Sequence, residues 1–273
     1  RYGCDPVTDA AARKMSPLVK VGDEDGSNRD GRVRGRRGPQ ASARQVRLSI
    51  FDLDRTLTRR PTYSLFLLKT AWRHSPWRLC LLPLLAPYAT AYFLKLLPRT
   101  KMKEAMHRVM LGPQLDGKRL RLFAETFVRE VASNGLYPDA LQRIQEEVAA
   151  GRRVIIATAA PAFYAKPLAK LLGIKDVVAS QPTWKDGWLL PEICGGNCHG
   201  PEKQRRVEAF LRHAGIERQH AHIRFFSDDV SDLPTFEWAD EAIAVNPCSG
   251  LASVARQRKW TVLDWRISHT VAA

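Results

Sequence analysis

Short apolar runs alternate with longer amphipathic segments along most of this chain. Six apolar runs have the length and composition of buried strands: residues 47–51, 153–157, 177–179, 223–226, 242–245 and 261–263. Residues 161–172 and 207–214 carry the apolar spacing of helices, and Gly173 is placed to end the first of them. Such alternation predicts an α/β fold with a parallel sheet and helices on both of its faces.

Two stretches interrupt the alternation of strands and helices. Residues 183–190, with Gly187 between two tryptophans, predict a small hairpin. Residues 59–150 have a helical pattern, in which residues 61–72 are apolar at helical spacing and apolar side chains recur later at every third or fourth position. We therefore predict a helical insertion over residues 59–150 in a core formed by residues 46–58 and 151–267.

Residues 1–45 contain several glycines, mixed charges and almost no apolar periodicity, which predicts a disordered leader. They lack the apolar stretch of a signal peptide, and their acidic residues argue against a transit peptide. The chain has five scattered cysteines, an odd number, which favours a reducing cytosol. Cys194, Cys198 and His199 raise zinc as an alternative, but this pattern supplies at most three ligands.

Basic residues exceed acidic ones, 43 Lys and Arg against 28 Asp and Glu, which gives a net charge of +15. The excess is concentrated: residues 55–103 contain ten basic residues and no acidic one. A cationic surface of this kind predicts anionic partners, namely phosphates, nucleic acid or an acidic membrane surface.

The segment FDLDRTLT, residues 51–58, places two aspartates at the end of the first predicted strand. Asp52 and Asp54 are two positions apart, so in extended chain their side chains share a face. Parallel sheets bind ligands at the carboxyl ends of their strands. Two carboxylates there repel each other and favour a bound cation, for which Mg²⁺ is the simplest candidate. The alternative is that both aspartates cap a turn.

Further polar side chains follow other predicted elements. Thr158 comes directly after the strand at 153–157, and Lys203 opens the helix after the hairpin. Asp228, Asp229 and Asp232 follow the strand at 223–226 in the segment SDDVSDLP. The sheet topology would bring these ends to one crevice. Carboxylates, a hydroxyl and an ammonium group are what the transfer of a phosphoryl group requires.

The order of these motifs resembles that of the haloacid-dehalogenase (HAD) superfamily of phosphatases, and specifically its phosphoserine-phosphatase-like branch. FDLDRTLT, SDDVSDLP and the strand end AVNP at residues 244–247 are similar to that branch over roughly residues 46–265. The resemblance implies a Rossmann-like parallel-sheet core with an inserted α-helical cap. The insertion at residues 59–150 fits that cap.

The resemblance also implies roles for the residues of the motifs. Asp52 would be the nucleophile that forms an aspartyl-phosphate, and Asp54 would protonate the leaving oxygen and then activate water. Thr158 and Lys203 would bind the transferred phosphate.

The metal in this family is Mg²⁺, and the resemblance implies its ligands as well. Asp52, Asp228 and the backbone carbonyl of Asp54 would bind the ion, and Asp232 would support that shell or hold Lys203. The sequence departs from the commonest family pattern at Arg55, where many relatives have glycine, and at Asp229, where serine is frequent.

An apolar segment with basic flanks, residues 77–97, lies within the predicted cap. Its residues 79–94 are uncharged but too few to cross a bilayer, and Pro83 and Pro87 would kink a helix there. Basic residues on both sides favour a segment that dips into one leaflet of an anionic membrane. The alternative is a hairpin of helices buried within the cap.

This cap, the hairpin and the segment CHGPEK at residues 198–203 resemble those of bacterial phosphatidylglycerophosphate phosphatases of the same superfamily. We therefore predict a Mg²⁺-dependent phosphatase that removes the terminal phosphate of a phospholipid head group, as a cytoplasmic protein peripheral at the inner face of the membrane. A soluble phosphatase for a small ester such as phosphoserine is the alternative. A nucleic-acid phosphatase or a basic nucleic-acid-binding protein is disfavoured, because no stacking platform is evident. Nothing in the pattern indicates an oligomeric state.

Overall fold

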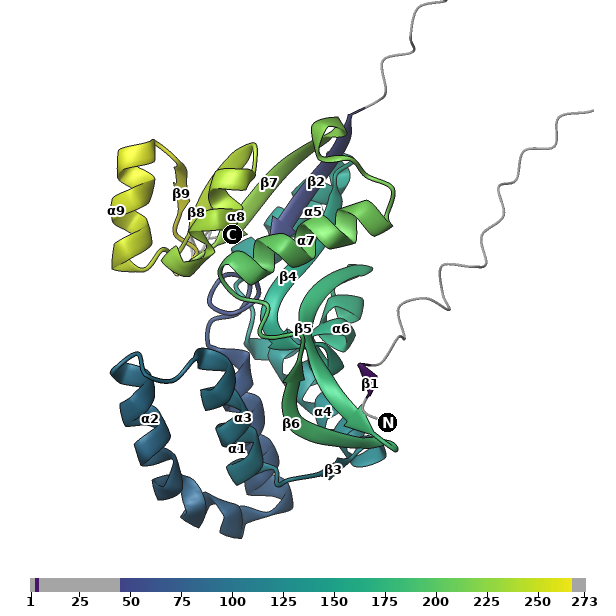
Figure 1. Ribbon diagram of the computed structural model, residues 1–273. Coiled ribbons are helices and arrows are strands. Elements are labelled where there is room, and N and C mark those ends of the chain that lie inside the picture. Colours follow the sequence, from purple (N-terminus) through teal and green to yellow (C-terminus); the bar gives the residue numbers. More distant parts are fainter. Residues whose placement is uncertain (1–2, 5–44, 267–273) are drawn as a thin grey trace, which may run out of the picture. The chain divides into compact units, whose positions relative to one another are not determined.

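The computed structural model describes residues 3–4 and 45–266 (Figure 1). The predicted leader, residues 1–45, lies outside the described residues except for Gly3, Cys4 and Gln45. The strands are β1 (Gly3–Cys4), β2 (Val46–Phe51), β3 (Leu115–Asp116), β4 (Arg153–Pro161), β5 (Asp176–Lys185), β6 (Trp188–Cys194), β7 (Ala221–Ser227), β8 (Glu241–Val245) and β9 (Thr261–Leu263).

The α-helices are α1 (Thr62–His74), α2 (Ala86–Phe93), α3 (Arg99–Met110), α4 (Gly117–Asn134), α5 (Pro138–Ala149), α6 (Ala162–Leu171), α7 (Pro201–His213), α8 (Leu233–Trp238) and α9 (Ser249–Arg258). The described residues also form the 3₁₀ helices η1 (Pro76–Leu85), η2 (Arg218–His220) and η3 (Val230–Asp232).

Strand β2 lies in the middle of the sheet, whose order is β3-β6-β5-β4-β2-β7-β8-β9, with β1 beside β5. It pairs in parallel with β4 and β7, so that Phe51 at its end lies opposite Ile156 and Phe226. Leu48 and Ile50 belong to one buried hydrophobic cluster and Phe51 to another, because alternate side chains of a strand point to opposite faces. Both faces are thus covered, which confirms the predicted α/β fold and its parallel sheet.

All six predicted strands are present, but the prediction around residues 177–190 is wrong in detail. The predicted short strand continues without a break into the first strand of the predicted hairpin, and together they form β5. The second strand of the hairpin is β6. The first half of β5 pairs in parallel with β4 and its second half pairs antiparallel with β6. Asp186 and Gly187 form the turn with φ of 48° and 85°, as a tight hairpin requires. Polar residues and Pro182 interrupt the apolar run, so the pattern hides the continuity.

The helical insertion packs against the sheet region through a shared cluster of aromatic rings. Phe66 of α1 lies 5.3 Å from Phe127 of α4 and 5.2 Å from Tyr164 of α6, measured between ring centroids. Such pairs bury large apolar areas and fix the relative orientation of the helices that carry them. The predicted cap and the predicted core therefore share one hydrophobic cluster. This packing fixes the position of α1 relative to the end of β2.

The apolar segment at residues 77–97 does not form a single helix. Pro83 lies within η1, and Pro87 lies in the first turn of α2, where a proline is tolerated. Among residues 45–266, no helix has both the length and the apolar character needed to cross a membrane. Helix α2 contains no buried residue, and Phe93 and Leu96 are 79% and 76% exposed. The alternative of a hairpin buried within the cap is therefore contradicted for α2 and the turn after it.

Candidate active site

The two aspartates of FDLDRTLT lie where β2 ends, and their side chains have different partners. The backbone N–H of Asp52 donates to the carbonyl of Phe226 at 2.8 Å, which continues the pairing with β7 by one residue. Its side chain is buried. The Oδ1 atom of Asp54 instead accepts hydrogen bonds from the N–H and the hydroxyl of Thr62, at 2.7 and 2.6 Å. Asp54 is thereby attached to the first turn of α1, which begins the cap.

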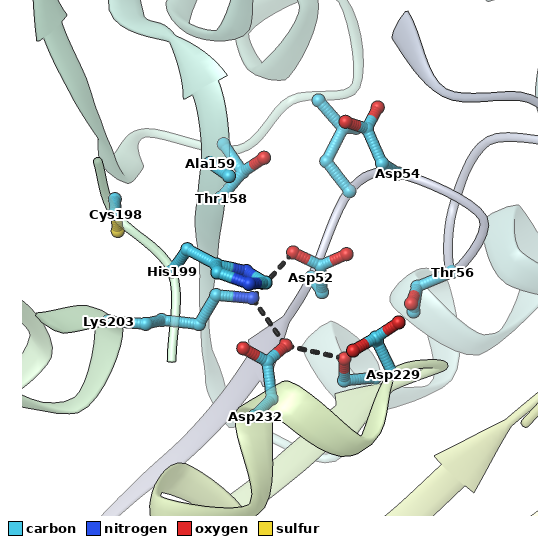
Figure 2. Close-up of polar contacts among 12 residues, drawn as sticks. Asp52, Asp54, Thr56, Thr158, Ala159, Cys198, His199, Lys203, Asp229 and Asp232 are labelled. Carbon is cyan, nitrogen blue, oxygen red and sulfur yellow. Dashed lines mark hydrogen bonds and ion pairs between the residues drawn. The ribbon is translucent and has the colours of Figure 1, made fainter. Parts of the chain in front are cut away.

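Lys203 bridges two carboxylates at the centre of the site (Figure 2). Its Nζ lies 2.7 Å from Oδ1 of Asp52 and 2.5 Å from Oδ2 of Asp232. The hydroxyl of Ser227, the last residue of β7, donates to the same Oδ2 of Asp232 at 2.7 Å. All of these side chains are buried, so the ammonium group replaces the water that would otherwise solvate the carboxylates.

Burial and charge shift the pKa values of this cluster. Burial raises the pKa of Asp52 to about 7; the ammonium of Lys203 lowers it, whereas the charges of Asp232 and Asp54 add to the rise. Burial alone would lower the pKa of Lys203, but Asp232 and Asp52 outweigh that effect and hold it above its ordinary value. Lys203 is therefore a permanent cation near neutral pH.

Asp228, which follows β7, carries a carboxylate that lines the same cavity as Asp52 and lies close enough for the two charges to interact. Burial raises its pKa to about 8, and the neighbouring charge of Asp52 adds to the rise. The hydroxyl of Thr56 lies 3.4 Å from its Oδ1, and its backbone carbonyl accepts from the N–H of Cys248 at 2.9 Å. Two buried carboxylates that repel each other are a donor set that a divalent cation would stabilise.

The oxygen donors of this site fit Mg²⁺, which prefers hard oxygen ligands. In the part of the chain that the structure describes, no three His, Cys, Asp or Glu side chains converge as a metal-binding group. Mg²⁺ is commonly held by one or two carboxylates and completes its octahedron with water and substrate phosphate. Asp52 and Asp228 meet that requirement, with a backbone carbonyl such as that of Asp54 as a further oxygen donor.

Thr158 lies inside β4, which continues to Pro161, rather than after the end of the strand as predicted. Its side chain is fully buried, and its Oγ1 accepts from the N–H of Ala160 at 3.0 Å. Ala159, beside it in Figure 2, lines the cavity of the site, whereas Thr158 does not. The backbone at the end of β4 is thus the part of this strand that faces the cavity, and the hydroxyl of Thr158 helps to fix its course.

The cavity has a volume of about 150 Å³, and the cap and the core both contribute to its wall. Asp52, Asp54, Lys203, Asp228 and Asp232 line it, so the structure brings these predicted residues together. Further residues line it that the sequence patterns did not single out as catalytic: Arg55, Pro61, Arg99, Ala159, His199, Asp229 and Ser231.

The side chain of Arg99, the first residue of α3 in the cap, contacts a residue of the core. Its Nη1 lies 2.9 Å from Nε2 of His199, which precedes α7. Burial lowers the pKa of His199 to about 4, and the charge of Arg99 adds to that fall, so the imidazole is neutral near pH 7. Within residues 45–266, no carboxylate forms an ion pair with Arg99. Donors of this guanidinium group therefore remain for an anion in the cavity.

A second basic side chain of α3 joins the cap to β4. Lys103 is buried, and its Nζ donates to the carbonyl of Ala159 at 2.8 Å and to Oδ1 of Asn197 at 2.9 Å. Burial lowers the pKa of Lys103 to about 7, and the positive charge of Arg99 adds to the effect. This contact fixes the carbonyl of a residue that lines the cavity.

Arg55 occupies a strained position at the mouth of the site. Its φ is 62°, a left-handed conformation that favours glycine. Its carbonyl accepts from Nδ2 of Asn246 at 3.3 Å, which helps to hold the turn. The exposed guanidinium group adds positive charge beside the cavity.

Comparisons with known proteins agree with this arrangement of motifs. Residues 50–237 match the family model of the haloacid dehalogenase-like hydrolases. The chain is 26% identical to phosphoserine phosphatase SerB1 of Mycobacterium tuberculosis over 148 residues, which are 54% of this chain and 47% of that protein. It is also 26% identical to histidinol-phosphatase of Neisseria meningitidis over 151 residues, 55% of this chain and 68% of that protein.

A solved structure shares the fold. A Bordetella pertussis protein of unknown function is 27% identical, with a TM-score of 0.70 over 81% of this chain and 99% of that one. The chain spans about half the length of the mycobacterial relatives that it matches.

Proposed function

Because the chain belongs to the haloacid dehalogenase-like hydrolases, we propose that it is a Mg²⁺-dependent phosphomonoester hydrolase that works through an aspartyl-phosphate at Asp52. The observation that carries this proposal is the buried contact between Lys203 and Oδ1 of Asp52, with Asp228 beside them. The contact leaves Oδ2 of Asp52 free of protein partners among the described residues, as a nucleophile requires.

In the first step, an oxygen of Asp52 attacks phosphorus and the bond from phosphorus to the leaving oxygen breaks. Asp54 donates a proton to that oxygen. Lys203 stabilises the negative charge on the transferred group as a point charge. Its contact with Asp232 keeps the ammonium aimed at Asp52. Mg²⁺ held by Asp52 and Asp228 would neutralise charge on the phosphate and reduce its repulsion from the nucleophile.

In the second step, water attacks phosphorus, the bond from phosphorus to the oxygen of Asp52 breaks, and Asp54 takes a proton from the water. Inorganic phosphate leaves, and both aspartates return to their initial states. The hydrogen bonds from Thr62 orient Asp54 through Oδ1 alone, so its Oδ2 remains available for proton transfer. Because Thr62 begins α1, a movement of the cap would move Asp54 relative to Asp52, which couples cap position to this step.

The test is the rate at which Asp52→Asn releases phosphate from p-nitrophenyl phosphate in the presence of Mg²⁺. We expect a loss of at least about a thousandfold, because an amide oxygen is a poor nucleophile. Asp186→Asn, in the β5–β6 turn, is the matched control and should retain full activity. Melting curves of both variants verify the fold. Unchanged activity in Asp52→Asn would reject the mechanism.

For the substrate, a small polar phosphomonoester is the first candidate. Two of the relatives are named as phosphatases of phosphoserine and of histidinol phosphate. Arg99, without an ion-pair partner in residues 45–266, favours a leaving group that carries a carboxylate over one that has none. Phosphoserine, which has a carboxylate, is therefore preferred to histidinol phosphate.

The head group of a phospholipid, such as phosphatidylglycerophosphate, is the second candidate. The exposed apolar side chains of α2 and of the turn after it favour this candidate, which would place the protein at the inner face of the membrane. Turnover of phosphoserine and of phosphatidylglycerophosphate in mixed micelles, compared at equal bulk concentration, separates the two. Faster hydrolysis of phosphoserine would reject the lipid.

A further inference from the structure

Large apolar side chains gather on the outer surface of the cap where α2 ends. Phe93, Leu94 and Leu96 are 79%, 64% and 76% exposed, and Tyr88 and Tyr92 are 45% and 37% exposed. We refer to these five residues as the α2 surface. Scattered apolar residues are ordinary on a protein surface, but five large exposed ones within residues 88–96 favour a contact site.

The exposed residues belong to an ordered turn. The N–H of Leu96 donates to the carbonyl of Ala91 at 2.9 Å, and the N–H of Lys95 donates to that of Tyr92 at 3.0 Å. Lys95 has a φ of 59°. This is a Schellman motif, in which an apolar residue at the position of Leu96 ordinarily packs back on the helix. Here Leu96 is largely exposed, so the ordered turn presents an apolar side chain to the solvent.

The charged residues that flank the α2 surface along the chain, up to residue 103, are all basic. Lys95 lies within the turn, Arg99 and Lys101 follow it, and no acidic residue occurs between residues 55 and 103. Lys101 is paired with Glu104, whereas Lys95 and Arg99 have no carboxylate partner among the described residues. Arg99 faces the active-site cavity, so Lys95 is the unpaired cation of this surface. Tyrosines and a lysine beside exposed apolar side chains are typical of surfaces that contact the interface of an anionic bilayer.

We propose that the α2 surface binds the surface of an anionic lipid bilayer, with Phe93, Leu94 and Leu96 inserted at the level of the head groups. Two other occupants fit less well. A second copy of this chain would bring the same cations face to face across a symmetric contact. Residues 5–44 contain no aromatic residue and many arginines, so they match neither the apolar character nor the charge of the surface.

This surface adjoins the mouth of the active site. Residues 97 and 98 separate it from Arg99, which lines the cavity and contacts His199. Docking through Phe93 and Leu96 would therefore bring the cavity close to the lipid head groups. That the protein would then hydrolyse a phosphorylated lipid head group rests on the proposed phosphatase activity. The binding of the α2 surface to the bilayer does not depend on that activity.

The test is sedimentation of the full chain with vesicles of phosphatidylcholine alone, or of phosphatidylcholine and phosphatidylglycerol in equal parts. We expect binding to the anionic vesicles at low salt, weakened at least about tenfold by high salt. The double variant Phe93→Ser/Leu96→Ser should bind at least about tenfold more weakly, because it loses its apolar insertion. The matched control Leu122→Ser/Val148→Ser changes residues that are 62% and 56% exposed on α4 and α5, and should bind like the parent.

Hydrolysis of a soluble phosphomonoester without vesicles should be equal in the parent and both double variants, which shows that the fold is intact. A parent that does not sediment with anionic vesicles would overturn the proposal, as would equal binding of Phe93→Ser/Leu96→Ser. A dimer that becomes monomeric in this variant, with no vesicle binding, would assign the surface to a second copy instead. Vesicle binding by a chain that hydrolyses nothing would keep the docking surface and reject the proposed activity.

Discussion

The ammonium nitrogen of Lys203 lies 2.7 Å from Oδ1 of Asp52, and both side chains are buried. Removal of the cation would leave Asp52 and Asp232 as buried carboxylates without a positively charged partner. We expect Lys203→Met to lower the free energy of unfolding at pH 7.5 by about 3–5 kcal/mol, measured with urea, and to abolish hydrolysis. Lys259→Met, an exposed lysine after α9, should change stability by less than about 1 kcal/mol. Equal stabilities of the two variants would contradict the role of the contact.

The stability of the metal-free protein should depend on pH through Asp52. Its pKa is raised from 3.8 to about 7 in the folded protein, so the protonated form favours folding. The contribution of this group to stability is therefore fully present below pH 3.8 and is lost as the pH rises through about 7. Asp52→Asn cannot titrate. In the presence of a chelator, the stability of this variant relative to the parent should therefore increase between about pH 5 and pH 8, by at least about 1 kcal/mol. Urea unfolding at both pH values measures this change. A difference that does not vary with pH would refute it.

Magnesium should stabilise the protein more strongly as the pH rises. Burial raises the pKa of Asp228 to about 8, so protons compete with the cation for this carboxylate near neutral pH. We expect Mg²⁺ to raise the melting temperature by several degrees at about pH 8, and by less at about pH 6. Asp228→Asn should remove most of the effect at both pH values. Undiminished stabilisation of Asp228→Asn would place the cation elsewhere.

Much of the candidate site could be predicted from the sequence because its residues stand next to apolar runs. Asp52 follows β2, Asp228 follows β7 and Lys203 lies in the first turn of α7, so the topology of a parallel sheet suffices to bring them together. Thr158 was placed correctly along the chain, but the pattern did not reveal that β4 continues past it. The position of a strand end depends on its neighbours, and β5 extends the pairing to Pro161.

The cap side of the site could not be predicted in the same way. Arg99 and His199 are a hundred residues apart, and their contact depends on how α3 packs over the sheet. No local periodicity encodes that packing. The partner of Asp54 is a similar case, because Thr62 is recognisable as its hydrogen-bond donor only once the start of α1 is placed. The exposure of Phe93 could likewise be recognised only from the structure, because an apolar run has the same sequence pattern in a core and on a surface.

Replacement of Arg99 should impair substrate binding more than chemistry. Arg99→Met removes a guanidinium group that lines the cavity but leaves Asp52 and Lys203 in place. We expect KM for phosphoserine to rise about tenfold, with kcat changed less than about threefold, as for the loss of a charge-assisted hydrogen bond. Arg108→Met, on the same helix and paired with Glu192, is the control. A fall in kcat at constant KM would assign Arg99 to the chemical step.

Replacement of Arg55 by glycine should stabilise the protein. The left-handed φ of 62° costs an arginine about 1 kcal/mol that glycine does not incur, and the side chain of Arg55 is exposed. We expect Arg55→Gly to raise the free energy of unfolding by roughly 0.5–1 kcal/mol in urea titrations. Arg59→Gly, at a nearby residue without a positive φ, should be neutral or destabilising. A loss of stability in Arg55→Gly would show that its side chain supports the turn.

The central claim is that the phosphoryl group passes through Asp52. The most direct measurement is to mix the protein with a substrate that carries a radiolabelled phosphoryl group, quench the reaction in acid within its first turnover, and map the labelled peptide. The account predicts a label on the peptide that contains Asp52, in an acyl-phosphate that hydroxylamine cleaves, and none in Asp52→Asn. A label on another residue, or hydrolysis by the parent protein without any labelled intermediate, would contradict it.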